Sequence, residues 1–151
     1  MIYVVVAGML VYFFVWPRFA PVNAEKWHVD PETVQKTRRP NQYLVRDGAD
    51  AQSPVFDMPA SAVFDHFDKI ARQKPNVTLV AGDPATGWAT YEQRSKKVQY
   101  PDYISVRATD LEDGRSKLSI YSRSRFGRSD LGVNEARVTN WLAALGQAVT
   151  R

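Results

Sequence analysis

Apolar residues recur every three or four positions in two segments of the chain, residues 60–72 and 133–150. This spacing places them on one side of an α-helix, as in a helix that packs one face against a core. Pro59 suits a first helical turn, and Pro75 follows the first segment as a helix breaker. The apolar positions are Val63, Phe64, Phe67, Ile70 and Ala71, and then Val138, Trp141, Leu142, Leu145 and Val149. We therefore predict two amphipathic helices.

Strand-like runs separated by turn residues fill the chain between these segments. The runs are residues 77–81, 87–94, 103–109 and 117–125, and a shorter candidate at 53–58 precedes the first helix with Val55 directed inward. Such an order is typical of the α+β fold class. We predict an antiparallel β-sheet of four to five strands covered by two helices, within a domain at residues 53–151.

The last two runs should form a β-hairpin, and its register decides which residues face the core. A two-residue turn at Asp113-Gly114 would pair Val106 with Tyr121 and place apolar residues on opposite faces. A three-residue loop, with Gly114 in the left-handed conformation, pairs Val106 with Ile120 instead. We predict the second register. Ser122 and Ser124 then turn inward, and the opposite face carries Tyr121, Arg123 and Arg125.

The N-terminus is apolar, with no charged residue from 2 to 16. A helix of this length would span only about 22 Å of a hydrocarbon layer about 30 Å thick, so we extend it and predict a transmembrane anchor at residues 2–20. A cleaved signal peptide is the alternative, because Val22-Asn23-Ala24 offers the small residues of a cleavage site. Residues 2–20, which we call the leader, nevertheless lack the cationic start of such a peptide. Residues 21–52 contain several prolines and are predicted as an extended linker lying on the domain.

Composition removes several function classes. The chain has no cysteine, which excludes disulfides, thiolate metal sites and a cysteine nucleophile. The net charge of +4 is a modest electrostatic footprint, and no nucleic-acid-binding motif accompanies it, so we expect no nucleic acid partner. The glycines of residues 127–132 resemble a phosphate-binding loop, but Val133 and Asn134 stand where such a loop needs Lys and Ser or Thr.

No catalytic or metal-binding constellation is recognisable. Ser129 lies beside Asp130 but lacks the GxSxG elbow of a hydrolase, and a base would have to be His28 or His66. A metal site using these histidines with Asp30 and Asp65 has no supporting spacing. We therefore predict a non-enzymatic domain with no catalytic residue, no metal and no cofactor.

The segment from 121 to 137, YSRSRFGRSDLGVNEAR, carries the densest charge. Its arginines and the amides at the following helix start could bind an anion such as a lipid headgroup or phosphate, or contact a partner. The alternative is that the arginines pair with Asp130, Glu135 and other acids to hold the turn. The candidate ligand- or partner-binding residues are Arg123, Arg125, Arg128, Ser129, Asp130, Asn134 and Arg137.

The same segment, followed by a Trp-Leu-Ala-Ala-Leu helix, resembles the C-terminal signature of an uncharacterised family, domain of unknown function 1499. Trp27-His28, Asp30-Pro31 and Pro40-Asn41 also resemble bacterial members, so the resemblance spans residues 27–145. Gln42 stands where many relatives carry a cysteine, so no cysteine-dependent role carries over. The resemblance implies no activity or cofactor, but it implies a location in the cell envelope.

Two signals bear on the side of the membrane that the domain faces. The cations that follow the leader favour a cytoplasmic domain, whereas the resemblance implies a single-pass protein of the bacterial inner membrane that faces the periplasm, which we expect. Our leading hypothesis is an accessory or assembly subunit of a membrane protein complex. The alternative is a domain of the cell envelope that binds lipid or another hydrophobic or anionic ligand.

Overall fold

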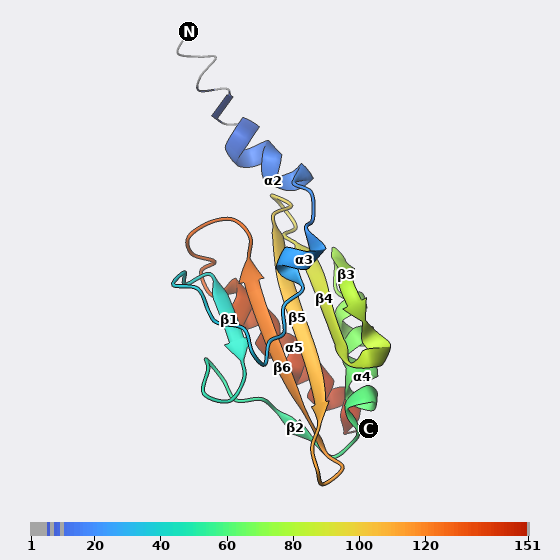
Figure 1. Ribbon diagram of the computed structural model, residues 1–151. Helices are drawn as coiled ribbons and strands as arrows, with labels where there is room; N and C mark the ends of the chain where they lie inside the picture. Colours follow the sequence, from blue (N-terminus) through green and yellow to red (C-terminus); the bar gives the residue numbers. More distant parts are fainter. Residues whose placement is uncertain (1–5, 7, 10, 151) are drawn as a thin grey trace.

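A computed structural model describes residues 6, 8, 9 and 11–150 as an α+β protein. Figure 1 shows one antiparallel sheet with two helices on one face. The strand order is β1-β6-β5-β4-β3, and β2 also pairs with β6. The strands are β1 (Gln42–Val45), β2 (Val55–Phe56), β3 (Val77–Asp83), β4 (Trp88–Arg94), β5 (Pro101–Asp110) and β6 (Ser116–Ser124). The covering helices are α4 (Ala60–Arg72) and α5 (Val133–Val149). The predicted fold class and both helices are confirmed.

The hydrophobic core lies between the sheet and these two helices. Phe67 of α4 packs against Tyr91 of β4 and Trp141 of α5, with ring centroids 6.2 and 5.8 Å away. Burial of this apolar surface is the main force that holds the helices on the sheet. The largest buried core side chains include Phe64, Phe67, Tyr91, Ile104, Leu118, Ile120 and Leu145.

The β5–β6 hairpin has the predicted register. Val106 lies opposite Ile120, and the loop consists of residues 112–114 with Gly114 at φ 81°. Leu111 donates its N–H to Arg115 O at 2.7 Å and closes the loop. Ser122 and Ser124 consequently point to the helix side, while Tyr121 and Arg123 point to the opposite face.

Three expectations need correction. The sheet has six strands rather than four to five, because Gln42–Val45, inside the predicted linker, pairs with β6 as an edge strand. The 53–58 candidate shortens to β2, and its Val55 is 48% exposed rather than directed inward, whereas Phe56 packs against the core. Both strands are too short for a period of two residues to be recognised in the sequence.

The N-terminal segment contains short helical pieces. A π-helix at Val11–Val15 leads into α2 (Trp16–Phe19), and α3 (Ala24–Trp27) follows. Within the part of the chain that the structure describes, no helix has both the length and the apolarity needed to cross a membrane. Part of the predicted anchor, residues 2–5, 7 and 10, lies outside the described residues.

The face of the sheet opposite the helices is covered by the segment that follows α3 (Figure 1). Trp27 stacks on Tyr103, and His28 stacks on Trp88, each pair with ring centroids 4.2 Å apart. Asp30 makes an ion pair with Arg107 of β5. We call this face the outer face; residues 27–30 are packed on it as part of the domain.

Candidate functional site

The side chains of strand β6 alternate between the two faces of the sheet. The charged segment, residues 121–137, therefore places its side chains in two different environments. Ser122 and Ser124 contact α5 on the helix side, and Tyr121 and Arg123 lie on the outer face. The two environments differ in how they balance the arginine charge.

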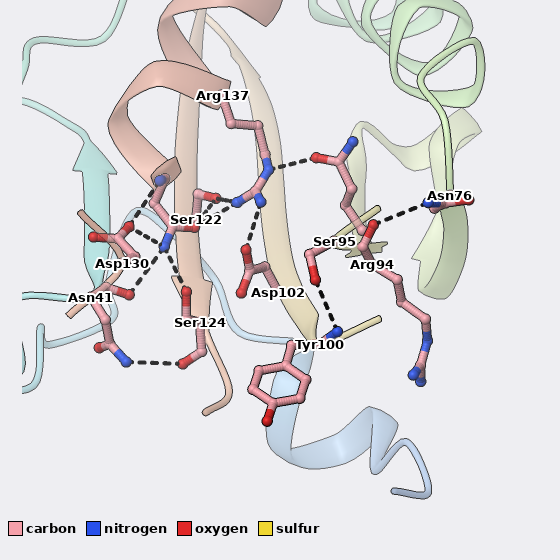
Figure 2. A network of polar contacts seen from close by, with 12 residues as sticks. Asn41, Asn76, Arg94, Ser95, Tyr100, Asp102, Ser122, Ser124, Asp130 and Arg137 are labelled. Atoms are coloured by element: carbon pink, nitrogen blue, oxygen red, sulfur yellow. Dashed lines mark hydrogen bonds and ion pairs between the residues drawn. The ribbon is translucent and has the colours of Figure 1, made fainter. Parts of the chain in front are cut away.

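On the helix side, Arg137 of α5 lies in a polar network (Figure 2). Its Nη2 donates to Asp102 Oδ2 at 2.6 Å, its Nη1 donates to Ser122 Oγ at 3.0 Å, and its Nε donates to Gln93 Oε1 at 2.6 Å. The Arg137 side chain is 8% exposed and that of Asp102 is 13% exposed. A carboxylate and neutral acceptors therefore satisfy this guanidinium inside the protein.

Asn134 joins the start of α5 to the rest of the same network. It is fully buried, and its Oδ1 accepts hydrogen bonds from Ser122 Oγ and Arg137 Nη1, both at 2.6 Å. Its Nδ2 donates to Asn41 O at 3.1 Å and to Ser124 Oγ at 3.0 Å. This amide therefore links β6, α5 and the segment before β1.

Asp130 secures the N-terminus of α5. Its carboxylate accepts hydrogen bonds from the backbone N–H groups of Gly132 at 3.2 Å and Asn134 at 2.8 Å. Gly132 stands at the helix N-cap with φ 80° and offers no side chain for capping. Asp130 thus satisfies a free N–H group of the first turn, which stabilises a helix start.

On the outer face, Arg123 is also buried, but it makes no ion pair with a carboxylate among the described residues. It is 8% exposed, and its Nη2 donates to Trp27 O at 2.5 Å. Its guanidinium lies 4.5 Å from the ring centre of Tyr121 and 5.2 Å from that of Trp27, within cation–π range. Burial lowers the pKa of Arg123 to about 10, so the group stays charged at neutral pH.

Arg123 lines a pocket of about 610 Å³ between the segment that crosses the outer face and strands β1 and β6. Its polar lining includes the cations Lys26, Arg39, Arg123 and Arg125, and its apolar lining includes Trp27, Val29, Val34, Tyr121 and Phe126. No acid belongs to the lining among the residues that the structure describes. We call this site the outer-face pocket.

Gln42 shapes one wall of the outer-face pocket. The Tyr121 hydroxyl donates to Gln42 Oε1, and Gln42 Nε2 donates to Arg39 O at 2.5 Å and to Thr37 O at 2.7 Å. These bonds hold the backbone around Thr37 and Arg39 against β1. The Gln42 side chain thus has a structural role in this chain.

The cations of the outer-face pocket differ from many other cations of the domain in that they make no ion pair among the described residues. Ion pairs are made by Lys36, Lys69, Arg72, Arg94, Arg107, Arg115, Lys117 and Arg137. The four pocket cations make none with any residue in the described ranges. Partly desolvated charges of one sign attract counter-ions strongly, because little water screens them.

A second hollow of about 590 Å³ adjoins the pocket and shares Arg39 with it. It is lined by Arg38, Arg39, Pro40, Gly127 and Arg128. Neither Arg38 nor Arg128 makes an ion pair within the described part of the chain. The turn after β6 therefore presents cations on both sides.

The structure divides the seven candidate residues into groups. Arg123 and Arg125 line the outer-face pocket, and Arg128 lines the second hollow. Ser129 accepts a turn hydrogen bond from Leu131 N at 3.3 Å. Asp130, Asn134 and Arg137 belong to the polar network. The alternative, in which the arginines pair with Asp130, Glu135 and other acids, is seen in part: among the described residues Arg137 pairs with Asp102, and no ion pair involves Asp130 or Glu135.

Sequence reasoning missed the other half of the pocket. Lys26 and Trp27 come from α3, and Arg39 and Gln42 come from around β1. The available signal was the presence of these cations beside the two motifs, Trp27-His28 and Pro40-Asn41, that carried the family resemblance.

The histidines do not come together. His28 lies on the outer face, where its Nδ1 is 2.9 Å from Thr90 Oγ1, while His66 belongs to α4 on the helix side. Burial lowers the pKa of His28, and Asp30 partly opposes this shift. Within the described residues no group of His, Asp and Glu side chains could hold a metal ion.

A family model, described as protein of unknown function (DUF1499), matches residues 27–145. The chain belongs to the DUF1499 family. The match begins at Trp27, so it includes the segment that covers the outer face of this DUF1499 domain as well as the sheet and helices. The recognised resemblance is thereby confirmed.

No curated protein matches the chain. Among solved structures, the crystal structure of Ara h 8.0201 is similar, with a TM-score of 0.45 and 10% sequence identity. The similarity covers 73% of this DUF1499 chain and 98% of the other chain.

Proposed function

We propose that this DUF1499 protein is a non-enzymatic domain that binds a small anionic ligand in the outer-face pocket. The observation that carries the proposal is the lining: four cations, no acid, and no ion pair for any of the four among the described residues. A buried charge without a partner is costly, so an arginine in this position favours an anion that neutralises it.

The pocket supports a ligand with an anionic group and an apolar body. Arg123 makes hydrogen bonds to Trp27 O, Ser105 Oγ and Tyr121 O within the described chain. A guanidinium has five N–H donors, so this leaves donors for a carboxylate or phosphate oxygen. Trp27, Tyr121 and Phe126 offer aromatic surface to the rest of the ligand. The volume lies in the usual range for small-molecule sites, roughly 300–1,000 Å³.

This proposal takes the ligand-binding alternative in preference to the accessory-subunit hypothesis. Unpaired arginines beneath a covering segment are not needed for assembly with a partner complex, whereas they favour the binding of a small anion. Of the lining cations, Arg123 is buried, whereas Lys26 and Arg39 are exposed. Such an arrangement draws an anion inward and then holds it where water screens least.

Calorimetric titration of the full chain in an uncharged detergent tests the proposal. The probes are naphthalene-2-carboxylate, its neutral carboxamide, decanoate and inorganic phosphate. We expect the carboxylate to bind about tenfold or more tightly than the carboxamide, because a charge-assisted hydrogen bond contributes about 1.5–3 kcal/mol. Equal binding of carboxylate and carboxamide, or no binding of any anion in this set, would overturn the proposal.

Substitutions assign the binding to the pocket. Arg125→Gln and Arg39→Gln should each weaken carboxylate binding, since both side chains line the pocket. Lys69→Gln is the matched control, because Lys69 lies on α4 in an exposed pair with Asp65. A control variant that weakens binding as much as the two pocket variants would show that only net charge matters.

A further inference from the structure

The two ends of the sheet carry opposite charge. We call the end where β6 leaves the sheet the leader-side end; it comprises residues 16–26, 38–41, 73–76, 95–100 and 125–132. Nine of its residues are cations and two, Glu25 and Asp130, are acids. The opposite end comprises residues 46–59, 83–87 and 110–115, with seven acids and two cations. The leader-side cations are Arg18, Lys26, Arg38, Arg39, Lys74, Lys96, Lys97, Arg125 and Arg128.

The charges of these nine cations are not balanced by ion pairs within the described part of the chain. None of them forms an ion pair with another residue of the described ranges. At the opposite end, by contrast, Arg115 pairs with Asp113. The leader-side end is therefore a positive surface that complements an anionic partner.

Exposed apolar side chains gather at the same end. Leu131 is 95% exposed, Phe19 is 75% exposed and Val98 is 40% exposed. Leu131 has φ 53°, a left-handed conformation that costs energy for a non-glycine residue, and it directly precedes the N-cap of α5. Among the large hydrophobic residues that are exposed in the described part of the chain, only Val55 belongs to the opposite end. The others lie between residues 6 and 22 or are Val98, Leu131 and Val133.

The apolar leader meets the domain at this end (Figure 1), and hydrogen bonds attach it there. Arg18 donates to Val98 O at 3.2 Å and to Lys97 O at 3.1 Å, within the loop between β4 and β5. Arg125 donates to Pro21 O at 2.8 Å. The leader thus departs from the same surface that carries the unpaired cations and the exposed loop tips.

We propose that the leader-side end docks on an anionic lipid bilayer, with Phe19, Val98 and Leu131 at the depth of the headgroups. Anionic lipids attract basic side chains that lie near the bilayer surface. Apolar tips between cations add burial in the interface, as in peripheral membrane proteins. The proposal goes beyond the pocket's ligand and holds whether residues 2–20 cross the bilayer or lie on it.

The absence of cysteine allows a site-specific test with the full chain. Single variants Leu131→Cys, Val98→Cys and Asp113→Cys are labelled with an environment-sensitive fluorophore and incorporated into vesicles of phosphatidylcholine with phosphatidylglycerol. We expect a lipid-attached quencher to reduce the emission of the labels at 131 and 98 and to spare the label at 113, in the opposite hairpin loop. Equal quenching at all three positions, or quenching at 113 alone, would overturn the proposal.

The charge contribution is tested in the label-bearing Leu131→Cys background. The combined substitutions Lys96→Gln, Lys97→Gln and Arg128→Gln should lower the quenching, as should vesicles of phosphatidylcholine alone. The matched control replaces Lys69, Arg72 and Arg115, which make ion pairs in the structure. If the control lowers the quenching equally, or if a single-stranded RNA displaces the label from the vesicles, the surface is not a specific lipid-docking site.

Discussion

Arg123 and Arg137 belong to the same charged segment and both carry largely buried guanidinium groups, yet the protein balances their charges differently. Arg137 has the carboxylate of Asp102 at 2.6 Å and neutral acceptors around it. Arg123 has backbone carbonyls, a serine hydroxyl and two aromatic faces. Burial alone therefore does not distinguish an arginine with a structural role from a candidate binding arginine. The presence or absence of a carboxylate partner does distinguish them.

The largest expected effect comes from removing the internally paired arginine. Arg137→Met should lower the free energy of unfolding by about 3–5 kcal/mol, because it leaves the Asp102 carboxylate buried without its partner. Urea unfolding followed by circular dichroism measures the change.

Arg115→Met serves as the control for that substitution. Arg115 pairs with Asp113 on the surface, with both side chains about half exposed, so we expect a much smaller loss than for Arg137→Met. If Arg137→Met costs no more than Arg115→Met, the network does not have the structural role assigned to it.

A smaller loss is expected from Asn134, which connects the network to β6 and to Asn41. Asn134→Leu should cost about 1–3 kcal/mol, since buried donors and acceptors on Ser122 and Asn41 lose a partner. Asn140→Leu on the exposed side of the same helix is the matched control and should change stability little. Similar unfolding midpoints for the two variants would contradict this account.

Arg123→Met sharpens the comparison directly, because it makes the same substitution as Arg137→Met. We expect a stability loss of about 1 kcal/mol or less, since no buried carboxylate is left unpaired. Carboxylate binding measured by calorimetry should nevertheless fall, because the pocket loses its buried charge. A stability loss as large as that of Arg137→Met would show that the two arginines have the same role.

The smallest effect concerns pH and His28, on the Arg123 side of the sheet. The pKa of His28 is lowered from 6.5 by burial, so the unfolded chain binds the proton more readily than the folded protein. Stability should therefore decrease as pH falls through about 6.5. Unfolding midpoints between pH 7 and pH 5 should decrease less in His28→Gln, and an identical pH dependence in both proteins would contradict the assignment.

Local patterns predicted much of the fold. The helix α4 covers the same residues, Ala60–Arg72, as the apolar period of residues 60–72. The hairpin register followed from the alternation of Val106 and Ile120 and from a glycine that the loop needs at φ 81°. In each case the information lies within a few residues, where helix period, strand period and turn chemistry act.

The candidate site was harder to predict, because its parts are distant in the chain. Arg123 and Arg125 were recognised, but their pocket is completed by Lys26, Trp27 and Arg39. Nor could spacing show that Arg137 would meet Asp102, 35 positions away in the chain. Short strands such as Gln42–Val45 carry too little periodicity to be recognised before their partner strand is known.

The sequence by itself determined the α+β class, both helices, the β5–β6 register and the faces to which Ser122 and Arg123 point. These features follow from backbone periodicity and from the preference of apolar side chains for the core. Only the tertiary structure decided which arginines find a carboxylate, that the 26–42 segment closes a pocket over β6, and that the unpaired cations gather at one end. Charge balance is a property of neighbours in space, so it emerges only once distant segments have packed together.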